Sequence, residues 1–149
     1  MLSVAPRPAP DGQLQLHAST VVIAGRAVAL AGPARVGKSG AALALMGRGA
    51  ALLADDITWF ARSDGGLLAS CPPTIAGRIE ARGIGILTVP AAPPAPLALI
   101  VDLGSLEQAR LPEPRVTDCL GAPIRLLHKA DTPHFIDGLY QYMLHSRTL

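Results

Sequence analysis

The chain has 149 residues, of which 50% are hydrophobic and only 3% aromatic, and its formal net charge at pH 7 is +2. This length and composition predict one domain with a core of Ala, Leu, Val and Ile, typical of an α/β or α+β enzyme-like domain and unlike a disordered chain. Because Lys and Arg are scattered and no apolar stretch reaches the roughly 18 residues of a spanning helix, we expect neither nucleic acid nor a membrane as a partner.

The N-terminal segment is rich in proline and has no periodicity, so we expect residues 1–13 to form a flexible arm and residues 14–149 to form the folded domain. It also lacks the charged head and apolar run of a signal peptide, which predicts a cytoplasmic protein. Cys71 and Cys119 lack C-x-x-C spacing and are interpreted as buried free thiols, not as metal or redox groups.

The first predicted elements are two β-rich runs, 19–23 and 27–31, joined by a turn at Ala24-Gly25-Arg26. The second run leads into a glycine-rich loop. Residues 39–46 then predict a helix that ends at Gly47, so the order is strand, glycine loop, helix.

The next segment predicts a short buried strand, 51–54, that ends in Asp55-Asp56. Residues 57–62 continue as a strand and form a hairpin with 67–69 through Asp64-Gly65-Gly66. Two carboxylates are therefore expected at the end of a strand.

The second half of the chain gives weaker patterns. Residues 75–81 are compatible with two helical turns, and 96–103 predict another buried strand. Prolines interrupt 111–129, which gives no clear element. Residues 132–144 predict a closing helix with Thr132 as its N-cap. We find no internal repeat and no second domain.

The glycine-rich loop matches G-x-x-x-x-G-K-[ST], a phosphate-binding pattern, and consists of Gly32, Pro33, Ala34, Arg35, Val36, Gly37, Lys38 and Ser39. In this pattern Gly37 lets backbone N–H groups surround the phosphates, Lys38 reaches the outer phosphates, and the Ser39 hydroxyl holds Mg²⁺. The start of the following helix adds a partial positive charge. A plain strand-to-helix turn is the alternative, but the flanking elements favour phosphate binding. We interpret Arg35 as a solvated charge.

Phosphoryl transfer also needs a carboxylate that holds the metal or accepts the proton of the attacking hydroxyl, and Asp55 and Asp56 are the candidates. If the strand continues through them, they point to opposite faces, with one toward the metal and nucleotide and one elsewhere. The alternative interpretation of Asp55-Asp56 is a polar turn that closes the strand. Taken alone, His17 is more typical of a structural or exposed residue than of a catalytic one. Residues 80–85, taken alone, are compatible with a helix end capped by glycine.

Four stretches in this order resemble the kinase domain of the HPr kinase/phosphorylase family, bacterial enzymes that phosphorylate a serine of the phosphocarrier HPr: LHAST (16–20), GPARVGKSG (32–40), LLADD (52–56) and IEARGIGIL (79–87). The resemblance covers about residues 14–103. It implies an α/β fold, a single P-loop kinase domain with a PEP carboxykinase-like nucleotide-binding core and a mixed sheet with flanking helices.

The resemblance implies catalytic roles for five residues: His17, Lys38, Asp55, Asp56 and Arg82. His17 corresponds to the family's active-site histidine, and Lys38 to its phosphate-binding lysine. Asp56, with Asp55 beside it, corresponds to the carboxylate that takes the serine proton and returns it during phosphorolysis.

The resemblance also implies cofactors and partners. Ser39 and Glu80 correspond to magnesium ligands, and Arg82 and Gly83 belong to the signature segment of the catalytic centre. ATP and Mg²⁺ are the implied cofactors. HPr or an HPr-like carrier is the implied protein partner, and a homo-oligomer, often a hexamer, is the implied assembly.

The sequence departs from the family pattern in three places. Gly40 stands where the family usually has Glu or Asp, and the N-terminal domain of larger members has no counterpart. The family's Pro-Gly-Arg-Asn segment, which is associated with the reverse reaction, also has no clear counterpart in this sequence. We therefore expect phosphorylation activity more than dephosphorylation activity.

Three functions follow as hypotheses. The first is an ATP-dependent serine protein kinase acting on HPr, with phosphorylase activity left open, that regulates carbohydrate metabolism linked to the phosphotransferase system. The second is a nucleotide-binding regulator with this fold but little or no turnover. The third is a phosphate-loop kinase for a small molecule.

Overall fold

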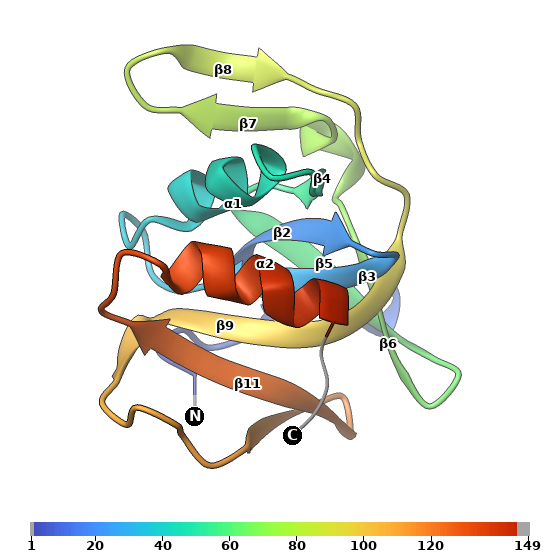
Figure 1. Cartoon of the computed structure of the whole chain (residues 1–149). Coiled ribbons are helices and arrows are strands. Elements are labelled where there is room, and N and C mark those ends of the chain that lie inside the picture. The colour runs from blue at the N-terminus through green and yellow to red at the C-terminus, as the bar shows by residue number, and fades with distance from the viewer. Residues whose placement is uncertain (1, 146–149) are drawn as a thin grey trace.

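The computed structural model describes residues 2–145, which form eleven strands and two α-helices in a mixed α/β fold (Figure 1). The helices are α1 (Lys38–Met46) and α2 (Phe135–His145). The strands are β1 (Arg7–Pro8), β2 (Leu14–Ile23), β3 (Arg26–Ala31), β4 (Ala51–Ala54), β5 (Ile57–Ser63), β6 (Gly66–Ser70), β7 (Arg78–Ala81), β8 (Gly85–Thr88), β9 (Ala95–Glu107), β10 (Arg115–Cys119) and β11 (Ala122–Ala130).

Nine strands form one mixed sheet in the order β1-β2-β5-β6-β9-β11-β10, while β3 pairs with β2 and β9, and β4 pairs with β2. The pairs β3–β9 and β9–β11 are parallel, and the other pairs of this sheet are antiparallel. Because β3, β9 and β11 run in the same direction, their carboxyl ends meet at one edge. The predicted mixed sheet with flanking helices is confirmed.

Two apolar clusters lie on opposite faces of β3, whose side chains alternate between them. Val28 and Leu30 contact the cluster that includes residues of α1 and α2. The alanines at 27, 29 and 31 face the other cluster, which Phe60 and Ile100 share. This alternation of large and small side chains fixes the face on which the helices pack and the direction in which the chain leaves β3.

The elements expected between residues 19 and 70 are all present. The two hairpins, the helix and the short buried strand occur in the predicted order, with some ends extended. The strand expected at 96–103 lies inside β9, and the closing helix is α2. The N-cap prediction was wrong: α2 begins at Phe135, and the Thr132 hydroxyl instead lies 3.0 Å from Nδ1 of His134.

The prediction of helical turns at 75–81 was also wrong. Residues 73–75 form a single 3₁₀ turn, and 78–81 form β7, which pairs antiparallel with β8 in a separate two-stranded sheet. In β7 the side chains of Ile79 and Ala81 are buried and those of Arg78 and Glu80 are exposed. That alternation has the period of a strand, and pairing with β8 outweighs the local helix propensity.

The N-terminal segment differs from the flexible arm that we expected. Arg7 and Pro8 pair with β2, and Leu2 and Val4 pack against the apolar cluster. Ser3 donates two hydrogen bonds to the buried Asp102 carboxylate, from its N–H (2.6 Å) and from Oγ (2.5 Å). Burial raises the pKa of Asp102, but these bonds, together with those from Gly104 and Ser105, lower it below its ordinary value.

The proline-interrupted segment 111–129 contains an antiparallel hairpin of β10 and β11. Cys119, on β10, is buried and Cys71 is half-buried; both are free thiols, and burial raises the pKa of each. No helix within residues 2–145 is long and apolar enough to cross a membrane.

Candidate active site

The phosphate loop joins the end of β3 to the start of α1 and has the backbone geometry that its glycines permit. Gly37 has φ of 105° and Gly32 has φ of 151°, in the region that L side chains rarely adopt. A Cβ atom on Gly32 would lie 2.8 Å from Cγ1 of Val36. Both glycines are therefore required by the path of the loop.

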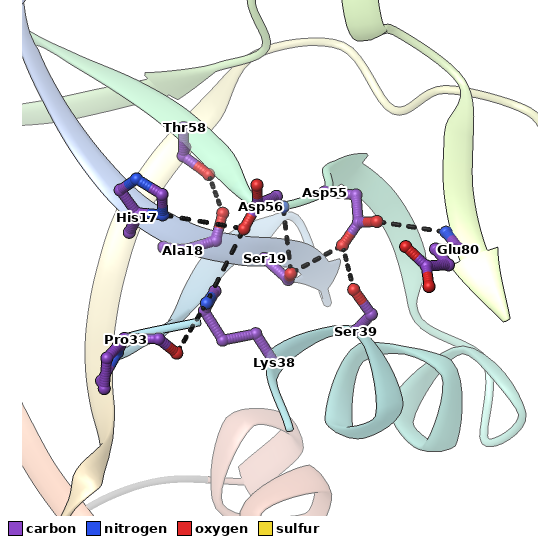
Figure 2. Close-up of polar contacts among 10 residues, drawn as sticks. All are labelled: His17, Ala18, Ser19, Pro33, Lys38, Ser39, Asp55, Asp56, Thr58 and Glu80. Atoms are coloured by element: carbon purple, nitrogen blue, oxygen red, sulfur yellow. Dashed lines mark hydrogen bonds and ion pairs between the residues drawn. The ribbon is translucent and has the colours of Figure 1, made fainter. Parts of the chain in front are cut away.

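Lys38 is the first residue of α1, and its side chain is only 5% exposed. Nζ donates a hydrogen bond to the Pro33 carbonyl oxygen (3.0 Å) and lies 3.7 Å from Oδ1 of Asp56 (Figure 2). The ammonium group thus lies between the loop backbone and a carboxylate, in position to contact an anion held in the loop.

Asp55 lies directly after β4 and accepts three hydrogen bonds (Figure 2). The hydroxyls of Ser19 and Ser39 each donate to Oδ1 at 2.7 Å, and the Glu80 backbone N–H donates to Oδ2 at 3.2 Å. Asp55 therefore connects β2, the phosphate loop and β7.

Asp56 adopts a left-handed conformation, with φ of 69°, between β4 and β5. Asp tolerates this region better than most residues. The chain turns there, so the strand does not continue through the pair and both aspartates line one cavity. Their carboxylates have different neighbours: Asp55 contacts Ser39, and Asp56 lies beside Lys38. Oδ1 of Asp56 lies 3.7 Å from Nδ1 of His17 and 3.7 Å from Nζ of Lys38.

Ser19 was missed by sequence reasoning, although it lies in the quoted LHAST stretch. Its hydroxyl donates to Asp55 and accepts the Asp56 backbone N–H at 3.1 Å. The signal was its spacing from His17, because residues two apart on a strand share a face. Ser19 is completely buried, and it orients the Asp55 carboxylate and holds the backbone of Asp56.

The cavity has a volume of about 460 Å³ and is bounded by the phosphate loop, the start of α1, the two aspartates and the β7–β8 hairpin. Glu80 and Arg82, from the end of β7 and the turn after it, both line it. Arg35 is an exposed residue of the loop, with φ of 70°, and it also lines the cavity, as does Gly40. Thus the structure brings together all the predicted catalytic and metal-binding residues except His17, which reaches this group through Asp56.

Residues 11–92 match the family model of the HPr Serine kinase C-terminal domain. The chain belongs to this family. All the residues of the candidate site described in this subsection lie within the matched segment, and β9, β10, β11 and α2 follow it.

Similar proteins support the assignment. The chain is 39% identical over 88 residues to an HPr kinase/phosphorylase of Clostridium botulinum (strain Eklund 17B / Type B), which covers 59% of this chain and 28% of that protein. It is 34% identical over 126 residues to one of Aromatoleum aromaticum, covering 75% of this chain and 40% of that protein. These curated relatives are therefore much longer than the segment they share with this chain.

A solved structure shows the same family fold. The Hpr(Ser) kinase/phosphatase from Coxiella burnetii superposes with a TM-score of 0.72 and 26% sequence identity, covering 87% of each chain. The structural similarity thus extends beyond the segment matched by the family model.

The family site offers oxygen donors that fit Mg²⁺. The Ser39 hydroxyl and the Asp55 carboxylate are already in contact, and Glu80 lines the same cavity. Hydroxyl and carboxylate oxygens are the ligands that Mg²⁺ prefers, and it is usually bound by one or two carboxylates together with substrate phosphates. Residues 2–145 contain no group of three or more His, Cys, Asp or Glu side chains arranged to hold a metal ion.

Proposed function

We propose that this chain is an ATP-dependent serine protein kinase that phosphorylates HPr or an HPr-like phosphocarrier. The observation that carries the proposal is the different environment of two adjacent carboxylates: Asp55 contacts the Ser39 hydroxyl, and Asp56 lies beside Lys38 and His17. One carboxylate can serve the metal while the other receives a proton, which is the division of roles that phosphoryl transfer requires.

In the proposed reaction the substrate serine oxygen attacks the γ-phosphorus of ATP. A bond forms between that oxygen and phosphorus, the bond from phosphorus to the β–γ bridging oxygen breaks, and ADP leaves with the electron pair. Asp56 accepts the serine proton. Lys38 offsets the charge that develops on the phosphoryl oxygens. Nδ1 of His17 lies 3.7 Å from Oδ1 of Asp56, and His17 orients that carboxylate.

Ser39, Asp55 and Glu80 would hold Mg²⁺, which neutralises charge on the outer phosphates when it is bound. In the structure the Ser39 hydroxyl donates to Asp55, so the two donors are held together before any ligand binds. Both oxygens therefore need little rearrangement to serve one cation.

A neighbouring cavity supports a protein as the phosphate acceptor. It has a volume of about 270 Å³, and its lining includes Asp55 and Asp56 together with Ile75 and Ile86. Ile86 is 65% exposed. Arg78 and Glu80 line the same cavity, so apolar and charged side chains lie together beside the proposed base. Such a mixed surface suits the side chains around a serine in a protein.

The proposed activity is tested by incubating the purified chain with γ-labelled ATP, Mg²⁺ and HPr. We expect label on an HPr serine with the wild-type chain and none with Lys38→Ala. Absence of label with the wild-type chain, under conditions in which it binds ATP, would refute the kinase.

That result would support the second candidate, a nucleotide-binding regulator with little turnover. Gly40 favours it, because this position of α1 lines the cavity and has no side chain where the family usually has a carboxylate. Phosphorylation of metabolites but not of HPr would instead support a small-molecule kinase.

The assembly is also a proposal. We infer a homo-oligomer, as the family resemblance implies, and the exposed Ile84 at the tip of the β7–β8 hairpin is compatible with a protein contact. Light scattering coupled to size-exclusion chromatography tests this, and a monomeric mass at micromolar concentration would refute it.

A further inference from the structure

A second cavity lies along α1 next to the cavity of the active site, and Ala41 and Ala44 of this helix line it. It has a volume of about 280 Å³ and shares Gly37 and Gly40 with the cavity of the active site. Its walls come from α1, the ends of β9 and β11, and the start of α2. In Figure 1 the phosphate loop, the end of β11 and the chain entering α2 lie at the same side of the molecule.

The walls of this cavity differ from those of the active site. Four of its larger lining side chains are apolar: Val36, Leu103, Phe135 and Ile136. Polar groups come from Lys129 and Thr132. An apolar cavity with a few polar groups at its boundary suits a flat aromatic base joined to a sugar that carries hydroxyls. The cavity volume is close to the roughly 300 Å³ lower limit of small-molecule sites.

The direction of the nucleotide in the active site is set by the proposed chemistry. The reacting phosphate must lie near Asp56, so the other end of the nucleotide extends away from the aspartates. Gly37 and Gly40 form the boundary between the two cavities, and neither has a Cβ atom to block the passage. The second cavity also lies at the carboxyl ends of the parallel strands β9 and β11, where ligands of open α/β sheets bind.

We propose that this second cavity holds the nucleoside, base and ribose, of the nucleotide whose phosphates occupy the loop. The proposal rests on the proposed nucleotide binding at Lys38 and Ser39. The ring of Phe135 and the side chains of Leu103 and Ile136 contact the base, and Lys129 and Thr132 supply polar contacts at its edge or to the ribose.

The test compares ligands that share phosphates but differ in the nucleoside. Calorimetry measures the affinity of the full chain for ATP and for inorganic tripolyphosphate, each with Mg²⁺. Ala44 lines the cavity, and Ala44→Trp fills it. We expect this variant to lose at least about tenfold in ATP affinity, and to bind tripolyphosphate like the wild type. Gln141→Trp, which adds the same ring to an exposed position of α2, should leave both affinities unchanged.

Two results would overturn the nucleoside site while leaving the phosphate loop intact. One is wild-type affinity for tripolyphosphate equal to that for ATP. The other is an Ala44→Trp variant that binds ATP as the wild type does, or that loses both ligands equally. If the wild type binds neither ligand, the proposed function fails as well.

Photolabelling with 8-azido-ATP gives a second measurement that requires no substitution. The azide is on the base, so we expect mass spectrometry to find label on residues 129–136. Label on the β7–β8 segment, residues 78–88, would overturn the proposal.

Discussion

The phosphate loop and the β7–β8 hairpin border the same cavity, but they are attached to the molecule in different ways. The loop lies between β3 and α1, and fully buried side chains such as Leu30 and Leu45 fix both elements. The hairpin forms its own two-stranded sheet, and only Ile79 and Ala81 of its strands are buried. One part of the site is thus built into the core, and the other depends on a few contacts, so we expect the hairpin to open at lower free energy.

The largest effect is expected on the loop. Lys38→Ala removes the buried ammonium group that offsets phosphoryl charge, so we predict a loss of about 10³-fold or more in kcat. Transfer of label to HPr measures it, and Lys38→Arg tests whether charge alone is sufficient. An active Lys38→Ala variant with an unchanged melting temperature would contradict the role of this residue.

The next largest effect separates the two aspartates. Asp56→Asn removes the proposed base, which should lower kcat by about 10²- to 10⁴-fold and leave Mg²⁺-dependent ATP binding intact. Asp55→Asn removes the carboxylate that contacts Ser39, so it should weaken that binding. Measuring kcat and ATP affinity for both variants checks the division. Full activity of Asp56→Asn would remove Asp56 from the reaction.

A third prediction compares the two regions in stability. Ile100→Ala in β9 should lower the free energy of unfolding by about 2–5 kcal/mol, because it leaves a cavity in the central sheet. Ile79→Ala, equally buried, should instead act mainly by freeing the hairpin. Hydrogen exchange then rises in 78–88 while β3 stays protected. Equal acceleration in both regions would show that the hairpin and the sheet unfold together.

The same difference explains which features the sequence could predict. The strand, loop and helix at 27–46 were predicted because local pattern, glycine positions and burial agree there. The hairpin was mistaken for helical turns because four residues carry too little periodicity, and its pairing with β8 is a tertiary effect.

Within the site, residue types were predictable but their contacts were not. Lys38, Asp55 and Glu80 could be identified from motifs, yet the turn at Asp56 that brings both aspartates to one cavity depends on a left-handed backbone that no pattern predicted. The bonds from Ser3 to Asp102 likewise join residues that are 99 positions apart in the sequence, so they could not be inferred from local sequence.

The smallest predicted effect concerns Gly40, in the first turn of α1. A Cβ atom there meets nothing within 4 Å, so Gly40→Ala should stabilise the fold by roughly 0.8–1 kcal/mol through helix propensity. Gly40→Glu should add roughly 0.3–1 kcal/mol from a negative charge near the helix N-terminus. Thermal unfolding of both variants measures these terms.

Gly40→Glu also tests the choice between kinase and regulator, because it restores the carboxylate that the family usually has beside the loop serine. If the missing charge limits turnover, Gly40→Glu raises kcat and Gly40→Ala does not, since only the former adds an oxygen ligand near Ser39. If both variants lower activity equally, the space at Gly40 matters and the charge does not. That outcome would agree with a nucleotide passing this residue on its way from the phosphate loop to the second cavity.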